Sequence, residues 1–138
     1  MRVCFVVGTL GRGGAERQLL YMLRALRQEG VESKVLCLTI GEPLESCIRE
    51  LGIDVEWVGK SPNQILRLRK IISAVKAYKP DLIQSSHFYT NIYAAIAGKV
   101  TNTVSIGAIR SDLRSELKGD SLFGPWQLKL PDYLVANS

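Results

Sequence analysis

Four glycines lie within residues 8–14, directly after a short apolar run: Gly8, Gly11, Gly13 and Gly14. Such a loop lets the backbone approach a ligand closely. A helix that begins at Ala15 would direct its free N–H groups and the positive end of its dipole toward an anion. The alternative is that the glycines serve only a tight strand-to-helix turn.

The glycine loop does not match the common nucleotide-binding motifs. Its spacing, Gly8-x-x-Gly11-x-Gly13-Gly14, differs from G-x-G-x-x-G, and no G-K-[ST] follows. The expected second strand ends at residues 38–41, without the acidic residue that holds a ribose in dinucleotide-binding domains. An NAD(P)-type Rossmann domain therefore stays as an alternative that rests on fold alone.

Three side chains with acid–base or anion-binding chemistry accompany this loop. His87 is the one histidine of the chain, and histidine titrates nearest to neutral pH, so it is either a catalytic or a structural group. Arg110 is either a phosphate ligand, through paired hydrogen bonds, or a solvated loop residue. Glu16 falls in the first helical turn, where a favourable interaction with the helix dipole, about 0.3–1 kcal/mol, is the alternative to a role at the ligand.

Apolar runs and helical periodicities alternate along the chain. Strands are predicted at residues 2–7, 33–40, 54–58, 81–86, 103–109 and 132–136; helices are predicted from Ala15 to just before Gly30 and at 43–51, 62–78, 89–99 and 125–130, with 110–121 as loop. This alternation predicts a single α/β domain, Rossmann-like and doubly wound, with a mostly parallel six-stranded sheet and helices on both faces. The expected strand order is 3-2-1-4-5-6 with right-handed crossovers.

In such a sheet, ligands bind beyond the carboxyl ends of the strands, at the point where the strand order reverses. In the expected order this point lies between the first and fourth strands. The glycine loop and residues 86–91 must then meet there, and Arg110 follows the neighbouring strand. We therefore expect the glycine loop, His87 and Arg110 to line one crevice.

The composition, 46% hydrophobic and 22% charged over 138 residues, is that of an ordinary globular domain. The net charge is +5, and residues 61–138 hold 10 basic and 5 acidic side chains, a bias that suits phosphates or an anionic lipid surface without requiring either. Three cysteines without C-x-x-C spacing indicate reduced cysteines in a cytoplasmic protein and argue against a metal site. No segment approaches the ~20 apolar residues that span a bilayer, and peripheral contact with the inner membrane face stays open.

Residues 13–20 (G-G-A-E-R-Q-L-L) resemble the retaining GT-B glycosyltransferases of glycosyltransferase family four, group 1. The likeness continues through residues 79–86 (K-P-D-L-I-Q-S-S), 109–110 and 135–138, and it covers almost the whole chain. It implies that residues 1–138 are the N-terminal, acceptor-side domain of a two-domain enzyme of bacterial polysaccharide synthesis. The C-terminal domain or complementary subunit, which would hold a uridine or guanosine diphosphate sugar, is absent from this sequence.

The resemblance also implies an activity and a set of site residues. The activity is transfer of a hexosyl group from a nucleotide diphosphate sugar to a glycan or glycolipid acceptor with retention, without metal, cofactor or nucleic acid. His87 would be the catalytic residue. The donor phosphates would contact Gly11, Gly13, Gly14, Glu16 and Arg110, and the acceptor crevice would include Arg12, Ser86 and Asn91.

The chain departs from the family pattern in two ways. Many relatives carry histidine at the positions of Gln84 and Ser86, whereas here the histidine is residue 87. Because a shift of one residue turns a strand side chain to the other face, His87 reaches the crevice only if the strand ends before it. Without a donor domain we expect the isolated chain to be inactive, and a non-catalytic module that binds phosphorylated ligands or a partner protein is the alternative function.

Overall fold

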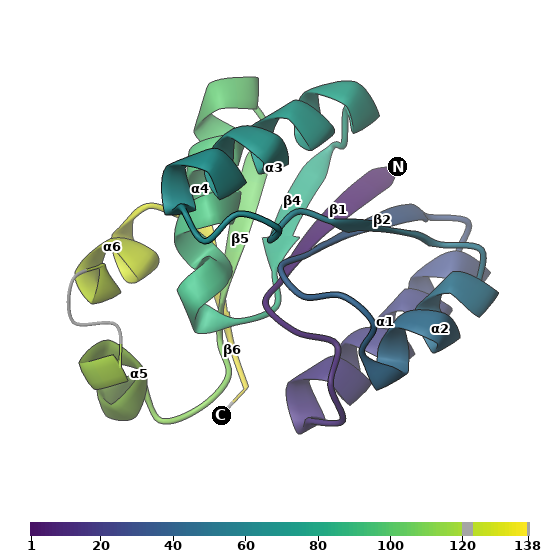
Figure 1. Cartoon of the computed structure of the whole chain (residues 1–138), viewed down its shortest axis with the longest axis horizontal. Coiled ribbons are helices and arrows are strands. Elements are labelled where there is room, and N and C mark those ends of the chain that lie inside the picture. The colour runs from purple at the N-terminus through teal and green to yellow at the C-terminus, as the bar shows by residue number, and fades with distance from the viewer. Residues whose placement is uncertain (120–122, 138) are drawn as a thin grey trace.

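The computed structural model describes residues 1–119 and 123–137, and within them six strands form one parallel sheet (Figure 1). The strands are β1 (Arg2–Val7), β2 (Glu32–Cys37), β3 (Asp54–Trp57), β4 (Leu82–Ser85), β5 (Val104–Ile109) and β6 (Tyr133–Ala136). Their order in the sheet is β3-β2-β1-β4-β5-β6. The predicted fold class and strand order are therefore confirmed.

Helices cover both faces of the sheet. They are α1 (Gly14–Gln28), α2 (Pro43–Glu50), α3 (Gln64–Tyr78), α4 (Asn91–Thr101), α5 (Leu113–Gly119) and α6 (Gly124–Lys129), and a 3-10 turn, η1 (Phe88–Thr90), precedes α4. Figure 1 shows α1 and α2 on one side of the sheet and α3 and α4 on the other. Among the described residues, no helix combines the length and the apolar character that crossing a membrane requires.

The central strand β1 supplies side chains to both halves of the core. Val3, Phe5 and Val7 pack under α1 and α2, whereas Cys4 and Val6 pack under α3 and α4, because successive side chains of a strand point to opposite faces. All five are at most 2% exposed. Each fully buried apolar side chain contributes about 1.5–3 kcal/mol, so the sheet holds the carboxyl ends of its strands in fixed positions.

Residues 110–121 were expected to be loop, and this prediction was wrong for the part that the structure describes. Residues 113–119 form α5, and the side chain of Asp112 accepts hydrogen bonds from the backbone N–H (3.0 Å) and hydroxyl (3.0 Å) of Ser115. This is the geometry of an N-terminal helix cap. Residues 120 and 121 lie outside the described residues.

Two other helices begin later than predicted. Helix α3 begins at Gln64 rather than at residue 62, since the Asn63 side chain accepts hydrogen bonds from the N–H groups of Ile65 (2.9 Å) and Leu66 (3.3 Å). Helix α4 begins at Asn91 rather than at residue 89, after η1. Both shifts move residues at the carboxyl edge of the sheet, where the crevice is expected.

The middle of β5 lies unusually close to its neighbours. A Cβ atom built on Gly107 would lie 2.8 Å from Cδ2 of Leu134, 2.9 Å from Cγ of Pro131 and 3.0 Å from Cγ of Asn91. Asn91 is fixed there, because its amide accepts from the N–H of Ala108 (2.8 Å) and donates to the carbonyl of Ala108 (3.0 Å). Only glycine permits this approach of β5 to β6 and α4.

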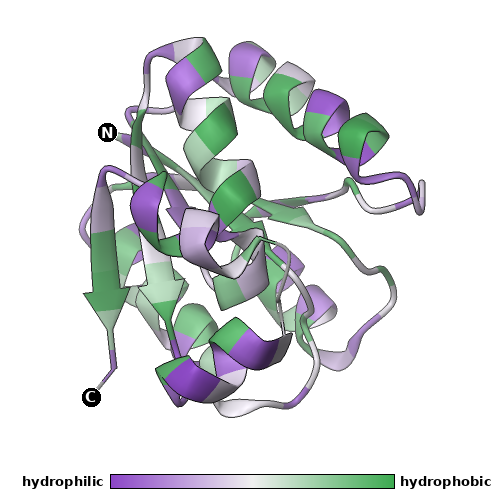
Figure 2. Cartoon of the chain, turned by 90° about the vertical axis from the view of Figure 1, so that its left-hand side faces the viewer, coloured by the Kyte–Doolittle hydropathy of each residue, from purple (hydrophilic) through white to green (hydrophobic). Residues whose placement is uncertain are grey.

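The two edges of the sheet differ in chemistry. At β3, Asp54 and Glu56 each lie 2.9 Å from the ammonium nitrogen of Lys34. At the other edge, Leu134 and Val135 of β6 are 41% and 42% exposed. Figure 2 shows this outer strand in the hydrophobic colour next to β5. One edge is therefore charged and the other is apolar.

Candidate functional site at the carboxyl edge of the sheet

His87 joins the two loops that meet where the strand order reverses. Strand β4 ends at Ser85, so His87 is already outside the strand, and its ring turns toward the glycine loop. The N–H of Gly8 donates to Nδ1 of His87 at 3.1 Å, and Nε2 lies 3.1 Å from Oε1 of Glu16 in α1. The side chains of His87 and Glu16 are only 12% and 10% exposed.

These two contacts define the tautomer of His87. A backbone N–H can only donate, so Nδ1 must be the accepting nitrogen. The ring proton then sits on Nε2, where it is donated to the carboxylate of Glu16. The geometry therefore fits the neutral Nε2–H imidazole, because a second proton on Nδ1 would oppose the N–H of Gly8.

The Tyr89 ring packs against both His87 and Gly8. Its ring centroid lies 5.5 Å from that of His87, and a Cβ atom on Gly8 would overlap the Tyr89 ring. Burial, together with the nearby negative charges of Glu16 and Glu42, raises the pKa of the Tyr89 hydroxyl. The hydroxyl, which its ordinary pKa of 10.0 already keeps protonated at neutral pH, is available as a hydrogen-bond donor.

The glycine loop is fixed from its other side by Glu42. The Glu42 carboxylate accepts from the hydroxyls of Thr9 (2.6 Å) and Thr39 (2.9 Å) and from the N–H of Leu10. Burial alone would raise the pKa of Glu42, but these hydrogen bonds outweigh it and lower the pKa. An acidic residue thus does follow β2, but its carboxylate holds the loop of its own chain.

Helix α1 begins at the crevice with free amides. Gly13 precedes it in an extended conformation, and the first helical bond runs from the N–H of Arg17 to the carbonyl of Gly13 at 3.2 Å. Within the described structure, the N–H groups of Gly14, Ala15 and Glu16 have no protein acceptor. The Glu16 carboxylate folds back over Gly13, where a Cβ atom would overlap it. Gly13 thus provides the space in which Glu16 reaches His87.

Arg110 follows β5 and connects it to α1. Its Nη1 donates to Oε1 of Gln18 (2.8 Å) and to Oδ1 of Asn137 (2.9 Å). Its Nε is buried and has no hydrogen-bond partner in the part of the chain that the structure describes. Burial lowers the pKa of the Arg110 guanidinium, which nevertheless remains cationic at neutral pH.

The residues predicted from sequence fall into two groups. Gly13, Gly14, Glu16, His87 and Arg110 lie around the start of α1 as expected. The others have different surroundings: Arg12 is exposed in the loop, the N–H of Gly11 donates to Thr9 within the loop, Ser86 is 1% exposed, and Asn91 is fully buried. Asn91 therefore connects α4 to β5 rather than facing an acceptor.

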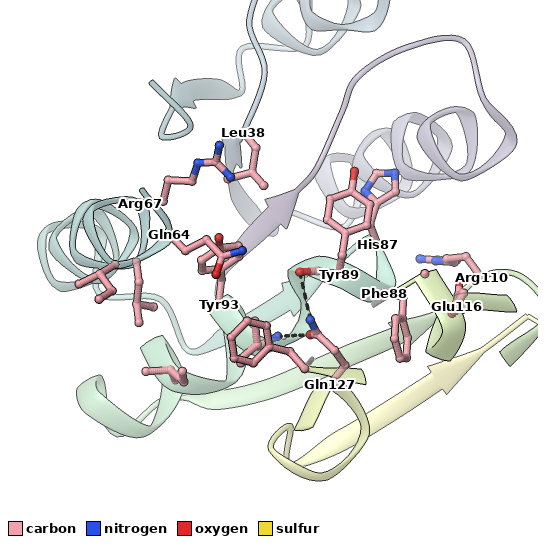
Figure 3. Close-up of a pocket in the computed structure, with 16 residues that line it drawn as sticks. Leu38, Gln64, Arg67, His87, Phe88, Tyr89, Tyr93, Arg110, Glu116 and Gln127 are labelled. Atoms are coloured by element: carbon pink, nitrogen blue, oxygen red, sulfur yellow. Dashed lines mark hydrogen bonds between the residues drawn. The ribbon is translucent and has the colours of Figure 1, made fainter. Parts of the chain in front are cut away.

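A pocket of about 680 Å³ opens beside His87 on the α3 and α4 face of the sheet (Figure 3). Its walls are mainly aliphatic and aromatic side chains: Leu38, Ile65, Leu68, Phe88, Tyr89, Ile92, Tyr93, Ile96 and Phe123. Its polar members include Arg67, Arg110, Glu116 and Gln127. Gln127 is held inside the protein, because its Oε1 accepts from the N–H of Ile92 at 2.6 Å. A pocket of this volume suits a small organic ligand.

Sequence reasoning missed Glu42, Gln18 and Tyr89. Each acts through a contact with a residue distant in the sequence, and no local motif marks such contacts. As for metals, residues 1–119 and 123–137 gather no group of three His, Cys, Asp or Glu side chains that could hold an ion.

Comparison with known proteins identified one matching family profile and several structures of similar fold. The sequence profile described as Glycosyltransferase Family 4 matches residues 12–138. The fold is similar to that of Anabaena HepE in complex with UDP-glucose (TM-score 0.80, 19% identity, 100% of this chain and 38% of HepE). It is also similar to Acinetobacter baumannii MurG (0.70, 10%, 98% and 40%) and to the lipopolysaccharide outer core galactosyltransferase WaaB (0.66, 15%, 97% and 38%).

These similarities concern the fold, and they cover part of each relative. The chain spans about two fifths of the length of the solved structures that it matches, 38–40%. A search among curated protein sequences gave no match.

Proposed function

Because the chain belongs to glycosyltransferase family 4, we propose that it forms the acceptor-side half of an enzyme that moves a hexosyl group from a nucleotide diphosphate sugar to a glycan or glycolipid. The proposal includes retention of configuration and a second, donor-binding domain or subunit. The observation that carries it is the meeting of the glycine loop, the free amides of α1 and His87 at one point of the sheet edge. We further propose that the protein acts in the cytoplasm, with peripheral contact at the inner membrane face.

In this proposal the start of α1 and Arg110 stabilise the leaving diphosphate. The free amides of Gly14 and Ala15 and the positive end of the helix dipole favour negative charge at this position. Arg110, which donates a hydrogen bond to Gln18 of the same helix, has a buried Nε that finds no partner among the described residues. These groups supply charge stabilisation without a metal ion. That HepE was solved with UDP-glucose supports a nucleotide sugar as donor.

His87 would contact the transferred sugar. In the structure its Nε2–H has Glu16 as acceptor, and a sugar hydroxyl can share or replace that acceptor. Glu16 is then a positioning residue, because it acts on the sugar through the ring of His87. Gly11 and Arg12 would contact the donor or acceptor from the loop, whereas Ser86 is buried.

The proposal is tested by transfer assays on this chain combined with its donor-binding domain or subunit. UDP- and GDP-sugars are offered with glycan and glycolipid acceptors, and the anomeric configuration of the product is read by NMR. The variant His87→Ala should lower kcat by about 10²-fold, a typical effect of losing a positioned polar group. Lys99→Ala, an exposed change on α4, is the control. If the two variants have equal activities, His87 is not required for transfer.

Calorimetric titration of the chain alone separates the alternative functions. We expect weak or no binding of UDP- and GDP-sugars and of NADH, since the donor site is proposed to lie in the second domain. Tight binding of NADH would favour a dinucleotide-binding domain instead. Tight binding of a nucleotide sugar would show that these residues hold the donor by themselves.

A further inference from the structure

The pocket beside His87 combines apolar walls with an excess of positive charge. Its charged lining residues are Arg67, Arg110 and Glu116, which leaves one net positive charge when His87 is neutral. Figure 3 shows Arg67 and Arg110 on opposite sides of the pocket, with Tyr89 and Gln127 between them. A purely polar sugar chain would leave most of this apolar wall without contacts.

Arg67 is the basic group most available to a ligand. Its Nε donates to the carbonyl of Ser61 at 2.6 Å, which fixes the side chain, and no protein acceptor for its two terminal nitrogens is found among the described residues. The terminal nitrogens of Arg110 are used in part by Gln18 and Asn137. A guanidinium of this kind binds phosphate with paired, charge-assisted hydrogen bonds.

Helix α3 adds to the positive potential on this side. Within Gln64–Tyr78 the basic residues are Arg67, Arg69, Lys70 and Lys76, and no acidic residue is present. Its first turn also carries two exposed aliphatic side chains, Ile65 (69%) and Leu66 (50%). Only Ile65 of these two lines the pocket.

We propose that the pocket binds an anionic amphiphile: an alkyl or isoprenoid chain between α3, α4 and α6, with its phosphate on Arg67 and its sugar end toward His87. The inference rests on the proposed function, and it narrows the acceptor from glycans and glycolipids in general to a sugar joined through phosphate to an apolar chain. The volume of about 680 Å³ holds the part of the chain nearest the phosphate, and a longer chain would continue beyond the pocket.

Calorimetric titration with three small probes, used below their micelle concentrations, tests the site. Octyl phosphate should bind about tenfold or more tightly than octyl β-glucoside, because only the phosphate gains charge-assisted bonds. Methyl phosphate should not bind measurably, because it lacks the chain. Equal binding of methyl and octyl phosphate would overturn the proposal in favour of a simple anion site.

Two matched pairs of variants assign the contacts. Ile65→Ser should weaken the binding of octyl phosphate several-fold, whereas Leu66→Ser should leave its affinity unchanged. Arg67→Gln should abolish the preference for phosphate over glucoside, Arg67→Lys should restore it in part, and Arg69→Gln should leave it unchanged. Equal effects within either pair would mean adsorption to the face of α3 rather than binding in the pocket, and would overturn the inference. Circular dichroism of each variant verifies the fold.

The outcomes separate this inference from the proposed function. If the chain binds octyl phosphate but the combined enzyme transfers no sugar, the amphiphile site is supported and the transferase proposal is contradicted. If the combined enzyme transfers sugar to free glycans but the chain does not bind octyl phosphate, the transferase proposal is supported and the amphiphile inference is overturned.

Discussion

At the scale of single residues, His87 uses both ring nitrogens inside the protein. Nδ1 accepts from Gly8 and Nε2 donates to Glu16, so the orientation and tautomer of the ring depend on where the Glu16 carboxylate lies. That position in turn requires the empty space above Gly13. The orientation and tautomer of the His87 ring therefore depend on a residue that carries no side chain.

We expect Gly13→Ala to disturb His87 and Gly14→Ala to leave it unchanged. A Cβ at position 13 would overlap the Glu16 carboxylate, whereas a Cβ at position 14 has no atom within 4 Å. Long-range ¹⁵N–¹H NMR reports on one ring, because the chain has one histidine. The neutral ring should show the Nε2–H tautomer in the wild type and in Gly14→Ala, and a mixture of tautomers in Gly13→Ala. Identical spectra for all three would contradict the proposed role of Gly13.

At the scale of elements, Glu42 connects the β2–α2 segment to the glycine loop through Thr9 and Leu10. The loop is therefore held from two sides, by Glu42 and by the pair of Glu16 and His87. Glycine-rich loops are otherwise costly to order, since glycine loses the most backbone freedom on folding. These hydrogen bonds should therefore offset that cost and favour one conformation of the loop.

The lowered pKa of Glu42 predicts a pH-dependent contribution to stability. Its ordinary value is 4.5 and the folded value is lower, so the stabilisation is complete above the ordinary value and disappears as the pH falls through the folded value. Glu42→Gln should lower the urea midpoint of unfolding at pH 7, and the difference from wild type should shrink at pH 3. The exposed Glu50→Gln is the control. A difference that persists at pH 3 would show that charge is not the cause.

The existence and order of the strands and most helices could be predicted from the sequence, but the residues at which helices begin could not. The glycine loop and His87 could also be singled out, but not the hydrogen bonds that they make in the fold. Continuous apolar runs such as β1 and the alternation of strands with helices are local properties, so the fold class and strand order followed from them. The start of α3 after Asn63 and the existence of α5 depend on single capping side chains in polar segments. The bond between Glu16 and His87 joins residues 71 positions apart, which no local pattern specifies.

At the scale of the whole molecule, the sheet has one protected edge and one that is open to pairing. The charges of Asp54 and Glu56 at β3 oppose the addition of another strand, as in many natural sheets. β6 presents exposed apolar side chains instead. Any further strand, from the same chain or from a second molecule, should therefore join at β6.

We expect the chain to self-associate through β6 at high concentration, and Val135→Lys to reduce this association, because a charge on an edge strand opposes strand-to-strand pairing. Val104→Lys is the matched control, since Val104 is 45% exposed but lies on β5, inside the sheet. Static light scattering gives the average mass of each protein over a concentration series. If Val104→Lys lowers the average mass as much as Val135→Lys does, the added positive charge in general, rather than its place on β6, causes the dissociation.

The close approach at Gly107 has a consequence for how this protein can change over evolutionary time. A side chain there would meet Leu134, Pro131 and Asn91 at once, and these belong to β6, the turn before it and α4. No single neighbouring substitution removes all three contacts, so a side chain at residue 107 requires several neighbours to shift together. A Cβ atom on Gly14 has no atom within 4 Å, so among proteins descended from this chain we expect residue 14 to vary more than residue 107.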